Sequence, residues 1–323
     1  MRWLILAFLL NCHTGIAGIN IPLQQNMEPP SLLTETGLFV GPIADLQPSS
    51  ELRPYQVNQS LWTDFADKQR WIYLPAGQMV GFDATEFWRF PVGTILVKHF
   101  RMEISKQRYQ NIETRLLVRK EGADVQNWVG YTYQWTGDLA QLVSPMASPK
   151  VALTVDATAL GGPRFQEYAI PSRRQCLQCH NASVGFVRSV RTHQLNRLVG
   201  LSNQLDEWNK LKIFDVEIEP ATTYDAYAAI DDPSSALEKR VRAYFSVNCA
   251  HCHNPHPQAM CNFVPLDFRD QHFKPEELVV NGYITPGAKM NSDLYLRMES
   301  TQSSYRMPFF GSVLKDEAAL TAV

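Results

Sequence analysis

The stretch Cys176-Leu177-Gln178-Cys179-His180 and a second stretch, Cys249-Ala250-His251-Cys252-His253, share one pattern: two cysteines separated by two residues and followed directly by histidine. This pattern is the attachment sequence of c-type haem, because each thiol can add to one vinyl group and the histidine can ligate the iron. The two copies use four of the six cysteines of the chain. They predict two covalently attached c-type haems, anchored at Cys176, Cys179, Cys249 and Cys252, with proximal iron ligands His180 and His253.

Other chemistry also uses Cys-x-x-Cys pairs. Two such pairs together can hold a structural zinc ion, and a thioredoxin-like redox site contains one pair. Neither alternative requires a histidine directly after both pairs, so haem attachment is the favoured interpretation.

The beginning of the chain is typical of an exported protein. Met1-Arg2 is a short positive segment, Trp3 to Leu10 is apolar, and small residues follow up to Ala17. This order predicts a signal peptide over residues 1–17 and a periplasmic mature protein. Cys12 faintly resembles a lipoprotein attachment site, but Asn11 before it is a poor match, so we expect no lipid anchor. No later segment has the length of a transmembrane helix.

Composition limits the remaining possibilities. The chain has 323 residues, of which 45% are hydrophobic and 19% charged, and a formal net charge of −2. A chain of this length has room for two or three small domains. The charge argues against nucleic acid or an anionic membrane as the main partner. Cys261 is left over from the motifs and is expected to be a buried free thiol, and the count excludes a disulfide framework.

Residues 37–170, after an N-terminal extension over 18–36, have the pattern of antiparallel strands. Apolar and polar residues alternate in 100–104, 112–119 and 129–135, as in strands with one buried face. We therefore expect a β-sandwich domain. The aromatic residues of the third strand either line a binding face or belong to the core, and burial is the commoner fate of such side chains: Tyr131, Tyr133 and Trp135.

The second half is expected to be mainly helical. Residues 193–211 have helical spacing of apolar side chains, within a first haem module at 171–232. Ser235 and Glu238 form a predicted capping box for a helix that leads into Cys249, within a second module at 233–323. The predicted fold class is therefore multidomain β + α: an antiparallel β-sandwich followed by two mainly α-helical, cytochrome c-like haem modules.

The second module resembles a class I cytochrome c, in which an amphipathic helix leads into the haem motif and a distal methionine follows. The segment Arg306-Met307-Pro308-Phe309 is similar to the distal-ligand segment of that family. The resemblance implies that Met307 is the distal ligand of the second haem. Met298 is a competitor, but its helical neighbourhood makes a core position the better interpretation. The expected terminal helix, 316–323, is shorter than in class I cytochromes, so either the end is truncated or another element covers the helix before the motif.

The resemblance extends to much of the chain. The segments 90–100, 113–119, 131–135 and 171–176 are similar to those of a bacterial family of di-haem c-type cytochromes with an N-terminal β domain, largely catalogued as conserved hypothetical proteins. The resemblance implies a periplasmic haem protein and no particular substrate. The distal ligand of the first haem stays open: His193, His99, or a position that is empty or holds water.

Three functions are compatible with these observations. The first is electron transfer between a periplasmic donor and a downstream acceptor, with the haems carrying the redox change. The second is a di-haem peroxidase-like oxidoreductase with one open iron, which would need an acid–base residue such as Glu167 or His193. The third is a haem protein whose β domain binds a carbohydrate or another small molecule, which requires Tyr131, Tyr133 and Trp135 to be exposed. An electron carrier is favoured over an enzyme.

Overall fold

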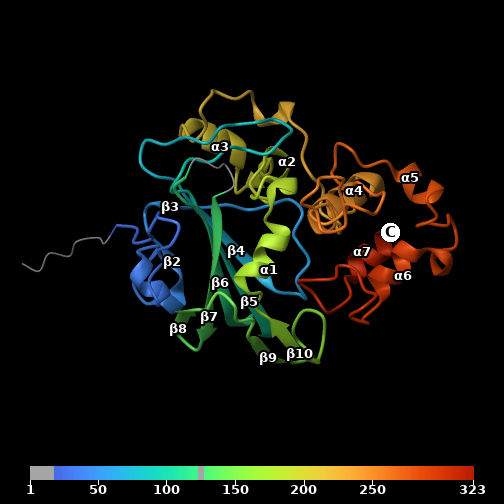
Figure 1. Ribbon diagram of the computed structural model, residues 1–323, viewed down its shortest axis with the longest axis horizontal. Helices are drawn as coiled ribbons and strands as arrows, with labels where there is room; N and C mark the ends of the chain where they lie inside the picture. Colours follow the sequence, from blue (N-terminus) through green and yellow to red (C-terminus); the bar gives the residue numbers. More distant parts are fainter. Residues whose placement is uncertain (1–17, 123–126) are drawn as a thin grey trace, which may run out of the picture.

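The computed structural model describes residues 18–122 and 127–323, so the predicted signal peptide and Cys12 lie outside the described residues. The protein is a mixed α/β structure, with one large antiparallel sheet and several short helices. Figure 1 shows the sheet at the centre, the N-terminal segment on one side, and the C-terminal helices α4 to α7 on the other. The β domain that the alternating pattern predicts is therefore present.

The large sheet has six strands in sequence order, each antiparallel to its neighbours. Three smaller antiparallel pairs are formed by β1 with β2, β9 with β10, and β11 with β12. The strands of the large sheet are β3 (Leu52–Pro54), β4 (Asp67–Tyr73), β5 (Ile95–Ser105), β6 (Arg108–Arg119), β7 (Trp128–Thr136) and β8 (Leu139–Leu142). The paired strands are β1 (Phe39–Val40), β2 (Gln47–Pro48), β9 (Lys150–Val155), β10 (Arg164–Ala169), β11 (Leu198–Val199) and β12 (Ser202–Asn203).

Both faces of the large sheet are covered. One face carries Val97 and Leu116, which pack in a core with residues of the N-terminal segment such as Leu33. The other face carries Leu96 and Leu117, whose core extends into residues 187–221. The β9–β10 pair also packs on the large sheet, so of the predicted sandwich the structure shows a β domain with one large and one small sheet. The extension at 18–36 belongs to the β core, and the segment after β10 supplies the opposite layer.

The helices are short, and the longest is the one that leads into the second motif. They are α1 (Arg173–Cys179), α2 (Thr192–Leu195), α3 (Gln204–Lys210), α4 (Leu237–Asn248), α5 (Pro275–Val280), α6 (Asp293–Glu299) and α7 (Glu317–Ala322).

The predicted single helix over 193–211 is wrong. The chain forms α2, then the β11–β12 pair, then α3. Gly200 lies in the turn of that pair with φ +64°, a conformation that glycine adopts without steric cost. Local turn geometry therefore overrides the apolar periodicity, and apolar residues of 187–221 share a core with the sheet.

The C-terminal segment has its own core. Phe245 on α4, Phe268, and Leu320 on α7 lie in one buried cluster, and α7 contacts both α4 and α6. The short terminal helix therefore covers α4 itself. The predicted capping box is wrong, because α4 starts at Leu237 with no side-chain cap and the Ser235 hydroxyl instead donates to Asp232 Oδ2 at 2.7 Å.

Candidate functional site

Helix α1 places the first motif directly against the sheet. Its start is fixed by a capping box, in which Ser172 Oγ accepts from the Gln175 N–H and the Gln175 side chain accepts from the Ser172 N–H. Cys176 lies against Gly130 of β7, where a Cβ atom would be 3.4 Å from Cys176 Cβ. Cys176, Cys179 and His180 then line one cavity of about 300 Å³, at the lower end of the range typical of small-molecule sites.

Gly130 sets the depth at which the first motif sits on the sheet. We expect Gly130→Ala to be tolerated, since its Cβ would make ordinary contacts, 3.4 Å and 3.8 Å, with Cβ and Sγ of Cys176. Gly130→Val adds bulk there, and overpacking costs about 1–3 kcal/mol. The valine variant should therefore carry less haem at the first motif than at the second, as measured by mass spectrometry of the haem peptides. Equal occupancy of both motifs in the valine variant would contradict this contact.

The ring of His180 is held in one tautomer. Its Nδ1 lies 2.7 Å from the carbonyl oxygen of Phe186, and because a carbonyl only accepts, Nδ1 carries the proton. Burial, reinforced by the positive charge of Arg188, lowers the pKa of His180 to about 3. The ring is therefore neutral, and its Nε2 lone pair is available to a metal, as in histidine ligands whose second nitrogen is hydrogen-bonded.

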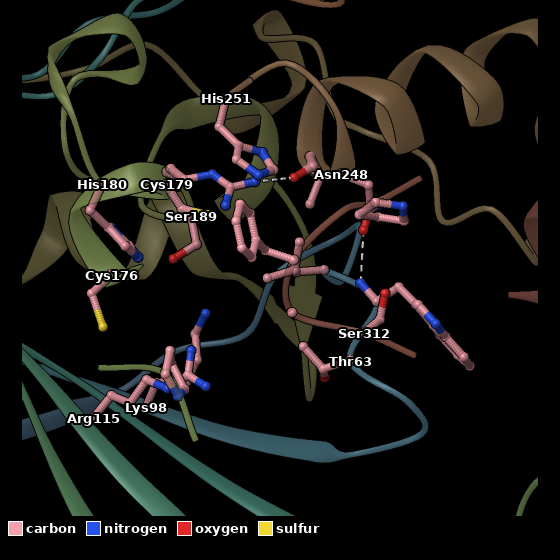
Figure 2. Close-up of a pocket in the computed structure, with 18 of the residues that line it drawn as sticks. Thr63, Lys98, Arg115, Cys176, Cys179, His180, Ser189, Asn248, His251 and Ser312 are labelled. Atoms are coloured by element: carbon pink, nitrogen blue, oxygen red, sulfur yellow. Dashed lines mark hydrogen bonds between the residues drawn. The ribbon is translucent and has the colours of Figure 1, made fainter. Parts of the chain in front are cut away.

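Basic side chains dominate the cavity walls. The cavity is lined by the basic residues Arg70, Lys98, Arg115, Arg188 and Arg306, with Asp64 and Glu167 as the acidic ones. Within the described parts of the chain, Arg115 is the one of these bases that forms an ion pair. Figure 2 shows Lys98 and Arg115 reaching into the cavity from the sheet, and His180 from the opposite wall. Buried positive charge is costly unless it is paired, so the cavity is suited to an anionic group.

The second motif begins where α4 ends. Cys249 is the C-terminal cap of α4, and its carbonyl oxygen accepts from the backbone N–H of Cys252 and of His253, both at 3.0 Å. The His253 ring contacts the Phe268 ring edge-on, with centroids 5.7 Å apart. Its Nδ1 is buried without a hydrogen-bond partner among the described residues, and burial, with Arg297, lowers its pKa to about 4.

The two motifs lie side by side, although they are distant in sequence. Asn254 Nδ2 donates to Ser183 Oγ at 3.3 Å, and the Ala182 N–H donates to Gln258 Oε1 at 3.2 Å, so the loops after the two motifs are bonded together. Arg188 spans the same interface by donating to the carbonyl of Val247 on α4.

These residues fit two c-type haems. The first site has two thiols and a neutral imidazole with a free nitrogen. Its cavity is lined by basic side chains, which suit the propionates of haem. The second has two thiols and a histidine with an orphaned ring nitrogen. In the parts of the chain that the structure describes, no three His, Cys, Asp or Glu side chains are grouped to hold a metal ion.

Two predicted residues of the first site lie elsewhere. His99 is on the face of the sheet opposite Lys98, where Thr114 Oγ1 and Asn111 Oδ1 bond its two ring nitrogens at 2.9 Å and 3.1 Å. His193 is stacked on Tyr227 and is not among the residues that line the cavity of His180. Neither histidine lines the cavity of His180, so the structure gives no support to either as the distal ligand, and that ligand stays open.

The residues proposed for enzymatic and carbohydrate-binding functions are also not placed for those roles. Glu167 is exposed at the rim of the cavity and pairs with Lys150 at 2.9 Å. The aromatic residues of β7 are buried in the core with the N-terminal segment, so the small-molecule hypothesis loses its supporting observation: Tyr131, Tyr133 and Trp135.

Met298 is a buried core residue of the C-terminal module, as expected. Met307 lies half-buried in the loop between α6 and α7, where its N–H donates to the Arg297 carbonyl at 2.8 Å. Ligation of the second haem by Met307 stays a prediction. Cys261 is half-buried and free.

Sequence reasoning missed the basic residues of the cavity. Lys98 and Arg115 occupy polar positions in alternating strands, which indicate a solvent-facing side, whereas here that side is covered. His251, between the cysteines of the second motif, also lines the cavity of the first. The sequence did contain one signal for this basic cavity, namely the many basic residues in adjacent strands.

None of the described helices is both long and apolar enough to span a bilayer. No protein-family model, curated protein or solved structure matches this chain. The resemblance to di-haem cytochromes therefore stays a prediction from the sequence.

Proposed function

We propose that the protein is a periplasmic di-haem c-type cytochrome that carries electrons from a periplasmic donor protein to a downstream acceptor. The observation that carries the proposal is the contact between the loops that follow the two motifs, Ser183 with Asn254 and Ala182 with Gln258. Groups attached at both motifs would be neighbours, as electron transfer within one chain requires. The haems supply the reversible one-electron chemistry.

The protein residues have distinct roles in this proposal. Cys176, Cys179, Cys249 and Cys252 anchor the two haems covalently. His180, oriented by the Phe186 carbonyl, and His253, packed against Phe268, supply the proximal nitrogens. The C-terminal segment, with α4 leading into its motif and α7 packed on α4, acts as a class I cytochrome c-like module. The first motif lies on α1, and the cavity beside it is closed on its other side by the large sheet.

A potentiometric titration of the mature protein, followed by optical spectroscopy, tests this function. We expect two reversible one-electron transitions, with the second haem at the higher potential, since a thioether ligand favours ferrous iron. Met307→Ala should lower that potential alone, and Met298→Leu, a core substitution, should leave both potentials in place. A haem that is high-spin as isolated and turns over peroxide would contradict the electron-carrier proposal.

A peroxidase-like enzyme is the second candidate, and the cavity beside His180 is the observation that favours it. The acid–base residues expected for that chemistry are poorly placed, because Glu167 is exposed and ion-paired and His193 is packed on Tyr227. Electron transfer is therefore the better supported function.

A further inference from the structure

Lys98 occupies the wall of the first cavity that faces His180. It lies in the middle of β5, and its register partners, Arg70 on β4 and Arg115 on β6, share its face of the sheet. His180 enters the same cavity from the end of α1. Figure 2 shows the two side chains on opposite sides of the cavity, with Cys176 beside the space between them.

The amine of Lys98 has no polar partner among the described residues. Its Nζ lies over the Phe100 ring, 5.6 Å from the ring centroid. Two other lysines near the sheet differ from Lys98, because their amines donate hydrogen bonds to backbone carbonyls. Lys68 Nζ donates to the Leu61 carbonyl at 2.8 Å, and Lys120 Nζ donates to carbonyls of the N-terminal segment, including that of Met27 at 3.2 Å.

A deprotonated lysine amine is a nitrogen donor of the same kind as imidazole. Lys98 lines the same cavity as His180, and its amine has no polar partner among the described residues. The side chain therefore has the position of a second nitrogen ligand to a metal held by His180.

We propose that Lys98 Nζ is the distal ligand of the haem attached at Cys176 and Cys179, which gives that iron histidine–lysine coordination. The inference rests on the proposed function, since it presupposes haem at the first motif. The Lys98 amine would occupy the distal position for which the sequence analysis considered His99 and His193. With two nitrogen donors, the first haem has a lower potential than a histidine–methionine haem, so electrons would enter at the first motif and leave at the second.

His251 is the competing donor, because it lines the same cavity and its Nδ1 is buried without a partner among the described residues. It is carried by the second motif, between Cys249 and Cys252. Figure 2 shows it on the side of the cavity that holds Cys179, away from Lys98.

The test uses the full-length mature protein with its haems. Lys98→Arg keeps a long basic side chain at this position but removes the ligating amine, because arginine stays protonated. We expect this variant to keep two haems while one of them becomes high-spin in its electron paramagnetic resonance spectrum and binds cyanide. Lys68→Arg, at a half-buried lysine on the same face of β4, and His251→Gln should keep both haems low-spin.

A second measurement needs no variant. Near-infrared magnetic circular dichroism of the ferric wild-type protein distinguishes histidine–amine coordination from histidine–methionine and bis-histidine coordination. A histidine–amine band for one haem is the expected result. A bis-histidine band, or a Lys98→Arg protein with two unchanged low-spin haems, would overturn the assignment while leaving the di-haem proposal intact. A wild-type protein without covalent haem would instead refute the proposed function.

Discussion

Replacing both Cys176 and Cys179 with alanine should reduce the covalently attached haem from two groups per chain to one. Both thiols of the first motif lie in the cavity that His180 lines, and no other described cysteine lines it. The second motif has its own helix and core, so its haem should stay attached. Mass spectrometry of the purified protein, compared with its haem absorbance, measures the loss directly.

Cys261→Ala is the matched control, because Cys261 is a free cysteine outside both motifs. It should keep both haems. If the double variant kept two haems, or if Cys261→Ala lost one, the assignment of the thiols would be wrong.

Glu113→Ala should strongly destabilise the protein. Glu113 is fully buried and accepts from Arg115 at 2.5 Å and 2.7 Å and from the Tyr168 hydroxyl at 2.7 Å. Removing one partner of a buried ion pair leaves the other charge uncompensated, which costs about 3–5 kcal/mol. Urea denaturation of the haem-loaded protein, followed by circular dichroism, gives the change in the free energy of unfolding.

The exposed pair of Glu167 with Lys150 is the comparison for this substitution. Because exposed ion pairs contribute at most about 1 kcal/mol, Glu167→Ala should have a small effect. Similar free energies of unfolding for the two variants would mean that the Glu113–Arg115 pair is not buried in solution.

The sequence predicted the strands of the sheet well. The alternating segments 100–104, 112–119 and 129–135 fall within β5, β6 and β7, because alternation reports local backbone geometry directly. The helix that leads into Cys249 was predicted for the same reason, since its apolar stripe has helical spacing. These features depend on neighbours a few residues apart.

The features that failed depend on distant contacts. Lys98 and Arg115 occupy polar positions of their strands, and nothing local indicates that the segment after β10 would cover them. Likewise, the apolar residues of 193–211 pack against the sheet around the turn at Gly200, so their spacing was mistaken for one helix. The contact between the two motifs also lies beyond local reasoning.

Intact-mass measurement of the mature protein, produced in a bacterial periplasm that attaches c-type haem, tests the central claim most directly. The account predicts the mass of the chain without residues 1–17 plus two haems, both retained after denaturation in acid. A chain mass without haem, or with haem that acid extraction removes, would contradict it.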